Sequence, residues 1–150
     1  MGQPEVYGTV ALGTLAVGVL SGDARITRSG ERIGVSLALA GLTTNLLKPL
    51  LGRRRPNVSR SAYSFHPLAS SEAFASGHTT MAFALAASVS DEVHSLPVSL
   101  ALYSGASLTA WSRLNDNKHW LTDVLAGAAI GITSAKLING RWRVFGVHGP

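Results

Sequence analysis

The sequence contains a histidine and an aspartate four residues apart, His119 and Asp123. On a helix, this spacing places both side chains on one face. A carboxylate in that position can accept the proton of one imidazole nitrogen and leave the other nitrogen free to act as a nucleophile. A helix-surface ion pair has the same spacing and stabilises a protein by only about a few tenths of a kcal/mol. Taken alone, the pair favours this plainer interpretation.

A second histidine, His78, follows a short segment of small residues in FASGHTT, residues 74–80. Ser76 is a good N-cap candidate, and Gly77 lets the backbone approach a ligand closely. The first N–H groups of the helix that follows can donate to an anion. We therefore expect His78 in the first helical turn, beside a bound anion, although an ordinary capped helix start would use the same residues.

Basic side chains gather near these histidines. Lys48 and Arg55 belong to KPLLGRRRP, and Arg113 lies six residues before His119, where its planar fork suits bidentate phosphate binding. A basic helix end also complements the helix dipole without any function. Seven of the thirteen Lys and Arg residues lie in short stretches between apolar segments, which indicates a focused anion site and not a nucleic-acid surface. They are Lys48, Arg53, Arg54, Arg55, Arg60, Arg113 and Lys118.

These residues must be positioned by the apolar stretches between them. Charge-free stretches cover about 6–22, 33–47, 79–90, 96–112 and 124–135, and the alternation typical of half-buried strands is scarce. The sequence therefore predicts an all-α bundle of about five helices. If the helices alternate in direction, the ends of the second and fourth and the starts of the third and fifth meet at one end, with every candidate residue there.

The composition favours a membrane protein. Apolar residues make up 46% and charged residues 14%, against roughly 25% charged residues in an average soluble domain. Because none of the five stretches is a strong spanning segment by the rule of about 20 apolar residues, a soluble bundle with an alanine-rich core remains the alternative. The expected loop GDARITRSGER, with Arg25, Arg28 and Arg32, lies opposite the candidate site. The positive-inside tendency places that side in the cytoplasm and the site outside it.

Cysteine is absent, which excludes disulfides and thiolate nucleophiles. No HExxH or similar ligand spacing appears, so we expect no metal site and assign no function to His66, His94 or His148.

The combined pattern resembles the type 2 phosphatidic acid phosphatase and vanadium haloperoxidase superfamily, whose signature is K-x6-RP, then PSGH, then SR-x5-H-x3-D. Lys48 with Arg55-Pro56, Ser76-Gly77-His78, and Ser112-Arg113 with His119 and Asp123 match it in order and spacing. Ala75 replaces the family's proline, which removes no chemical group. The resemblance covers about residues 33–138 of a single domain, 1–150. The family's membrane members usually have six helices with the first motif ending the third, which leaves a first helix unaccounted for here.

The resemblance implies a phosphatase that needs no metal or other cofactor and binds vanadate as a phosphate mimic. His119 would attack phosphorus to give a phosphohistidine, Asp123 would hold its tautomer, and His78 would transfer protons. The remaining matched residues would hold the phosphate: Lys48, Arg55, Ser76, Gly77 and Arg113.

The leading substrate is a lipid phosphate or diphosphate, in a bacterial inner membrane with the site facing the periplasm or exterior. A soluble acid phosphatase acting on small phosphoesters, a vanadium-dependent haloperoxidase and a non-catalytic bundle are the alternatives.

Overall fold

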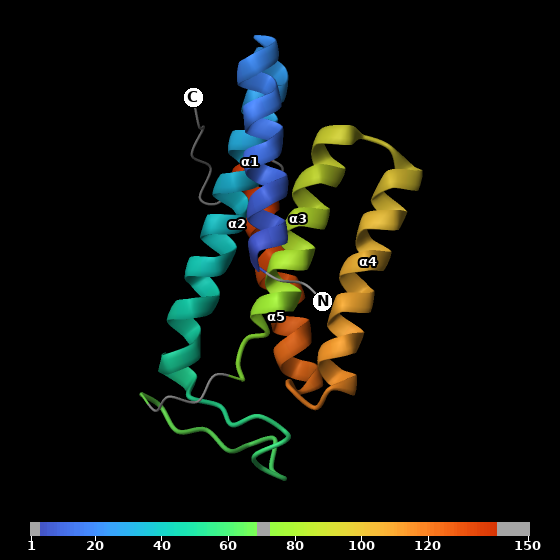
Figure 1. Cartoon of the computed structure of the whole chain (residues 1–150). Coiled ribbons are helices and arrows are strands. Elements are labelled where there is room, and N and C mark those ends of the chain that lie inside the picture. The colour runs from blue at the N-terminus through green and yellow to red at the C-terminus, as the bar shows by residue number, and fades with distance from the viewer. Residues whose placement is uncertain (1–3, 69–72, 141–150) are drawn as a thin grey trace.

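The computed structural model describes residues 4–68 and 73–140, and these form a bundle of five helices (Figure 1). Within these ranges no strand occurs, and Arg53 and Phe65 form only an isolated bridge. The predicted all-α class is therefore confirmed. The helices are α1 (Pro4–Ser21), α2 (Ala24–Leu51), α3 (Gly77–Val93), α4 (Leu96–Asn115) and α5 (Leu121–Ile138).

Helix α2 is longer than the apolar pattern indicated. The segment expected as a loop is helical from Ala24 onwards, because the Asp23 side chain caps the helix by accepting from the backbone N–H of Arg25 at 2.8 Å and of Ile26 at 3.3 Å. The cap lets the basic residues form the first turns of the same helix. With this extension α2 reaches 28 residues, and both α2 and α5 are long and apolar enough, by length and composition, to cross a membrane.

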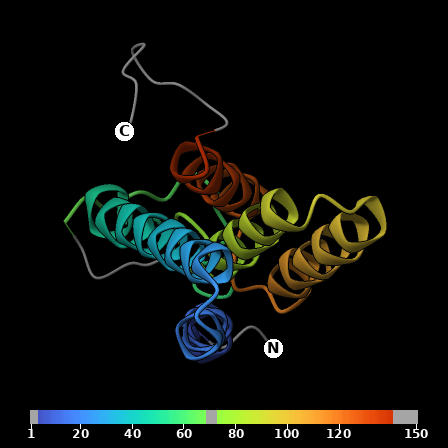
Figure 2. The same ribbon diagram turned by 90° about the horizontal axis from the view of Figure 1, so that it is seen from above.

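Seen from above, α3 lies in the middle of the bundle and contacts α2, α4 and α5, while α1 packs mainly against α2 (Figure 2). The C-terminal ends of α2 and α4 meet the N-terminal ends of α3 and α5 at one end of the bundle (Figure 1). This is the arrangement that alternating helix directions predict. The three motifs are thus brought together although they lie far apart in the sequence.

Helices α3 and α5 pack backbone against backbone. A Cβ atom on Gly131 would lie 2.3 Å from the carbonyl oxygen of Thr80, and one on Gly127 would lie 2.8 Å from the carbonyl oxygen of Ser76. Any side chain at these two positions would force the helices apart. The glycines therefore fix the spacing between the helix that carries His78 and the helix that follows His119.

The buried side chains are small and partly polar, whereas large apolar side chains face outwards. The largest fully buried side chains are threonines, serines and one aspartate, and alanine dominates the buried apolar residues. Large exposed apolar side chains occur on α1, α2, α4 and α5, among them Leu12, Leu42, Leu108 and Leu125. Helix interfaces built from small and hydroxyl residues are typical of bundles in lipid.

Candidate active site

A cavity of about 510 Å³ opens at the end of the bundle where the motifs meet. Six of the eight predicted site residues line it: Lys48, Arg55, Gly77, His78, Arg113 and His119. The other two, Ser76 and Asp123, are fully buried and do not line the cavity. Lys118, one of the seven basic residues of the expected anion site, and Tyr7 of α1, which the sequence did not single out, also contribute to the wall.

His119 lies in the short turn between α4 and α5, and only 7% of the residue is exposed. Its Nδ1 lies 2.7 Å from the carbonyl oxygen of Ala73. A carbonyl oxygen can only accept a hydrogen bond, so Nδ1 carries the proton. Nε2 is then the ring nitrogen with a free lone pair, which is the state that a nucleophile needs.

Asp123 is placed differently from the sequence expectation. Its Oδ2 lies 3.9 Å from Nδ1 of His119, which is beyond hydrogen-bonding distance, and the Ala73 carbonyl accepts the ring proton instead. Oδ2 accepts from the backbone N–H of Trp120 at 2.8 Å, so the carboxylate caps the start of α5. Asp123 can therefore influence His119 in two ways: by the charge of its carboxylate, and by holding the turn before α5 that carries His119.

The second partner of Asp123 is Arg53, which the sequence analysis counted among the basic residues of the expected anion site without giving it a role of its own. Nη1 of Arg53 donates to Oδ1 of Asp123 and, at 2.6 Å, to the hydroxyl of Thr122. Nε and Nη2 donate to the carbonyl oxygen of Ala62 at 2.9 and 2.6 Å. Both members of the ion pair are buried, with the side chains 6% and 0% exposed. Arg53 thus joins the loop after α2 to the start of α5.

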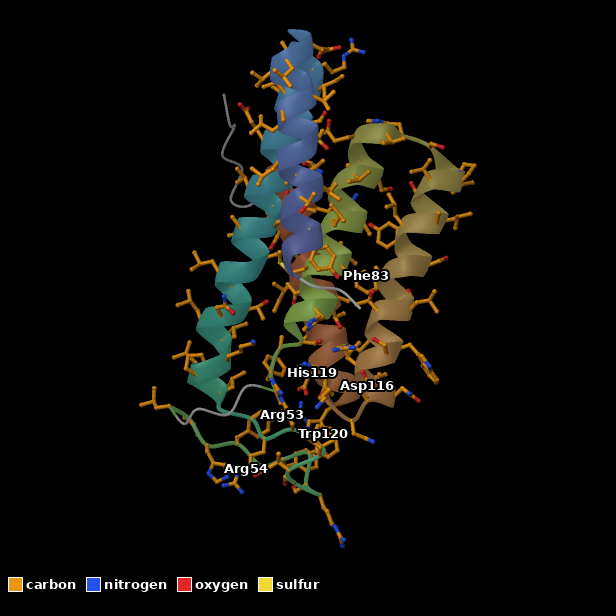
Figure 3. All side chains as sticks on the ribbon, viewed as in Figure 1. Arg53, Arg54, Phe83, Asp116, His119 and Trp120 are labelled. Carbon is orange, nitrogen blue, oxygen red and sulfur yellow. The ribbon has the colours of Figure 1, made fainter. Side chains whose placement is uncertain are left out.

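Two aromatic rings lie within cation–π distance of the Arg53 guanidinium, whose carbon is 5.1 Å from the ring centroid of Phe65 and 5.7 Å from that of Trp120. Figure 3 labels Arg53 and Trp120 at the end of the bundle that also carries His119. Nε1 of Trp120 also donates to the carbonyl oxygen of Arg54 at 2.9 Å. In the run of three arginines, Arg53 is buried and Arg54 is exposed, and the sequence carries no signal that separates the two.

Helix α3 begins at the cavity as predicted, with Ser76 in the N-cap position. The hydroxyl of Ser76 makes no cap bond, and it accepts from the Thr79 hydroxyl at 3.0 Å. The backbone N–H of Ser76 donates to the carbonyl oxygen of Asp123 at 3.0 Å, which fixes the start of α3 against α5. Because Gly77 and His78 line the cavity, the free N–H groups of this first turn lie beside it.

The cavity is strongly positive. Four cationic side chains line it, namely Lys48, Arg55, Arg113 and Lys118, and no Asp or Glu does so among the described residues. Outside the wall, Nη2 of Arg113 pairs with Oδ2 of Asp116 at 3.0 Å. A concave site of one sign concentrates ligands of the opposite sign, so the cavity favours an anion.

Burial lowers the pKa of His119 to about 4 from its usual 6.5; the hydrogen bond to Ala73 opposes this shift, and the charges of Arg55 and Lys48 add to it. We therefore expect His119 to stay neutral, the state in which an imidazole can act as a nucleophile, down to about pH 4. An NMR titration of the histidine-labelled protein, assigned with His119→Asn, should give a midpoint near that pH. A midpoint near pH 6.5 would contradict the buried setting.

The same shift links His119 to stability. The unfolded chain takes up this proton near pH 6.5, whereas the folded chain takes it up only near pH 4. Above pH 6.5 the ring is neutral in both states and has no effect on the pH dependence of stability. As the pH falls from 6.5 towards 4, the unfolded chain binds a proton that the folded chain does not, so the folded protein loses stability.

The remaining histidines lie away from the cavity or outside the described residues. His66 is exposed, with Nε2 3.2 Å from the Ser64 hydroxyl, and exposed His94 ends α3 at the far end of the bundle. His148 lies outside the described residues. Over residues 4–68 and 73–140, no group of three or more His, Cys, Asp or Glu side chains could hold a metal ion.

Comparison with known proteins gives two matches. The sequence profile of the PAP2 superfamily matches residues 32–143. The Lipid A 1-phosphatase of Porphyromonas gingivalis is 37% identical over 110 residues, which cover 72% of this chain and 22% of that protein. The chain therefore spans about a fifth of the length of this relative. No solved structure matches significantly.

Proposed function

The chain belongs to the PAP2 superfamily, and on that premise we propose that it is a phosphatase that hydrolyses a phosphate ester of a membrane lipid. The observation that carries the proposal is the setting of His119. Its ring is held by Ala73 with the proton on Nδ1, and it lines a cavity whose ionised side chains are all cationic. A neutral imidazole beside several cations is suited to attack on phosphorus.

In the proposed first step, Nε2 of His119 bonds to phosphorus as the bond to the ester oxygen breaks, and His78 protonates the departing oxygen. In the second step, His78 removes a proton from water, which attacks phosphorus and releases phosphate. The carboxylate of Asp123, 3.9 Å from Nδ1, stabilises the positive charge of the phosphorylated ring.

The phosphate oxygens are held by cations from three segments. Lys48 comes from the last turn of α2, Arg55 from the loop after it and Arg113 from the last turn of α4. The N–H groups at the start of α3 add donors that are already oriented. We propose that the reaction needs no metal, because these groups neutralise the transition state, and that vanadate binds here as a phosphate mimic.

The lipid part of the proposal rests on the outside of the bundle. Large apolar side chains face outwards, α2 and α5 are long and apolar enough to span a membrane, and the relative is named for a phosphatase of a lipid. We propose a bacterial inner membrane with the site on the periplasmic side, because Arg25, Arg28 and Arg32 lie at the opposite end. The variant Arg60→Cys should then react with an impermeant thiol reagent in intact cells, whereas the variant Arg25→Cys should not.

The proposed function is tested by phosphate release from phosphatidate and from a water-soluble aryl phosphate, in micelles with and without a chelator. We expect phosphatidate to be hydrolysed with the higher kcat/KM, the chelator to have no effect, and orthovanadate to inhibit. Preference for the soluble ester would overturn the lipid assignment. A requirement for a divalent cation would overturn the mechanism.

A further inference from the structure

An apolar groove lies beside the candidate active site, between α3 and α4. Its volume is about 420 Å³, and its wall includes Leu85 and Ala86 of α3 and Leu102 and Ala106 of α4. Among the described residues, no charged side chain lines it. The groove therefore suits an apolar ligand, in contrast to the positive cavity at the end of the bundle.

The groove is open because two helices that flank α3 do not meet. Helices α1 and α4 both contact α3, but over the described residues they make no contact with each other (Figure 2). The side chains that border the space are small, such as Ala82 and Ala86 on α3. On α4, a Cβ atom added to Gly105 would meet no packed neighbour within 4 Å. The bundle thus leaves room here that its own side chains do not fill.

Tyr7 connects the groove to the cavity, because it lines both. Only 6% of this residue is exposed. Its side chain is hydrogen-bonded to that of Thr109, a groove residue whose hydroxyl donates to the carbonyl oxygen of Gly105 at 3.1 Å. The polar groups at the junction are therefore satisfied within the protein. On one side of the Tyr7 ring the surroundings are cationic, and on the other side they are apolar.

The groove leads away from the cavity along α4. Its wall extends from Thr109 to Val98, which corresponds to about 16 Å at the helical rise of about 1.5 Å per residue. Thr109 is the nearer of the two to Arg113 and to the cavity, and Val98 lies near the start of the helix. A ligand with its anionic group in the cavity would therefore place an attached chain along this wall.

We propose that the groove holds one hydrocarbon chain of the lipid whose phosphate occupies the cavity, with Tyr7 at the boundary between chain and headgroup. The inference rests on the proposed function and goes beyond it, because the chain is then bound by the protein and not left in the surrounding lipid. Its basis is the continuity of the groove with the cavity at Tyr7. A helix of a second copy would make no use of that continuity.

The direct test is photolabelling in micelles with a phosphatidate that carries a diazirine in one acyl chain. Mass spectrometry should locate the label on the two segments that line the groove, Ala82–Ala86 and Val98–Thr109. The variant Gly105→Leu fills the open space between them. Labelling of these segments should then fall at least about tenfold, the effect expected when about two methylene groups lose their burial.

The matched control is Gly13→Leu. Gly13 is exposed on α1, a Cβ atom there likewise has no neighbour within 4 Å, and the residue lines neither the groove nor the cavity. This variant should be labelled as the wild type is. In turnover, Gly105→Leu should lower the ratio of kcat/KM for phosphatidate to kcat/KM for the aryl phosphate about tenfold, because the aryl phosphate has no chain. Gly13→Leu should keep the wild-type ratio.

Labelling of the groove segments that is unchanged in Gly105→Leu, or that falls equally in Gly13→Leu, would overturn the inference while the proposed function stands. An unchanged kcat/KM ratio together with a new oligomeric state of Gly105→Leu, measured by light scattering in micelles, would assign the groove to a second copy and also overturn it. Selective labelling of the groove in a protein that hydrolyses no phosphate ester would support the chain site and overturn the proposed function.

Discussion

Replacement of His119 by asparagine is expected to lower kcat by at least about 10⁴-fold while the helices stay folded. Asparagine keeps an N–H group that can donate to the Ala73 carbonyl, so the buried position stays satisfied. It has no ring nitrogen that could bond to phosphorus. The measurements are phosphate release from phosphatidate and far-UV circular dichroism of the same preparation.

The matched control is His94→Asn. His94 ends α3 at the opposite end of the bundle with a φ of 53°, a left-handed conformation that asparagine tolerates well. This variant should keep the wild-type rate. Radiolabelled substrate quenched in alkali should label the wild type and His94→Asn but not His119→Asn. A rate for His119→Asn within tenfold of the wild type would rule out the covalent intermediate.

The second large effect is expected at Arg53. Arg53→Met should lower the free energy of unfolding by about 3–5 kcal/mol, because it leaves the carboxylate of Asp123 buried without its ionic partner. Methionine fills a similar volume between Phe65 and Trp120, so the loss comes mainly from the unpaired charge. Denaturant unfolding in micelles measures this loss in the free energy of unfolding. The kcat should fall as well, because Asp123 no longer holds its position beside His119.

Arg54→Met provides the control for Arg53, since it removes a neighbouring charge from an exposed side chain. Its effect should stay within about 0.5 kcal/mol. The double variant Arg53→Met with Asp123→Asn should recover part of the stability, because asparagine carries no charge that needs a partner. If Arg53→Met and Arg54→Met lower the free energy of unfolding by the same amount, the buried ion pair does not stabilise the fold as its geometry indicates.

Much of this architecture could be predicted from the sequence, for physical reasons. Apolar stretches separated by glycine, proline and charge mark five helices, and alternating helix directions bring Lys48, His78, Arg113 and His119 to one end. The start of α2 was missed because charged residues interrupt the apolar pattern. Charged side chains on an exposed face do not end a helix, and Asp23 caps it well before the apolar stretch begins.

The partners of the candidate catalytic residues were harder to predict. The acceptor for His119 is the backbone carbonyl of Ala73, and a backbone atom has no signature in the sequence. Arg53, Arg54 and Arg55 are identical in type, and only the fold makes the first of them buried and the second exposed. Tyr7 reaches the cavity from α1, outside all three motifs. Contacts of this kind depend on the tertiary packing and not on local spacing.

Gly127 and Gly131 set the distance between α3 and α5 by direct contact of the two backbones. His78 is carried by the first helix, and His119 lies two residues before the second. At these two positions no side chain lies between the helices, so the contact cannot be adjusted there by repacking side chains. The proposed proton donor, His78, and the proposed nucleophile, His119, therefore belong to one closely packed block. Changes of headgroup preference should arise in the parts that border this block, α4, its following turn and the loop after α2, without moving the reacting groups.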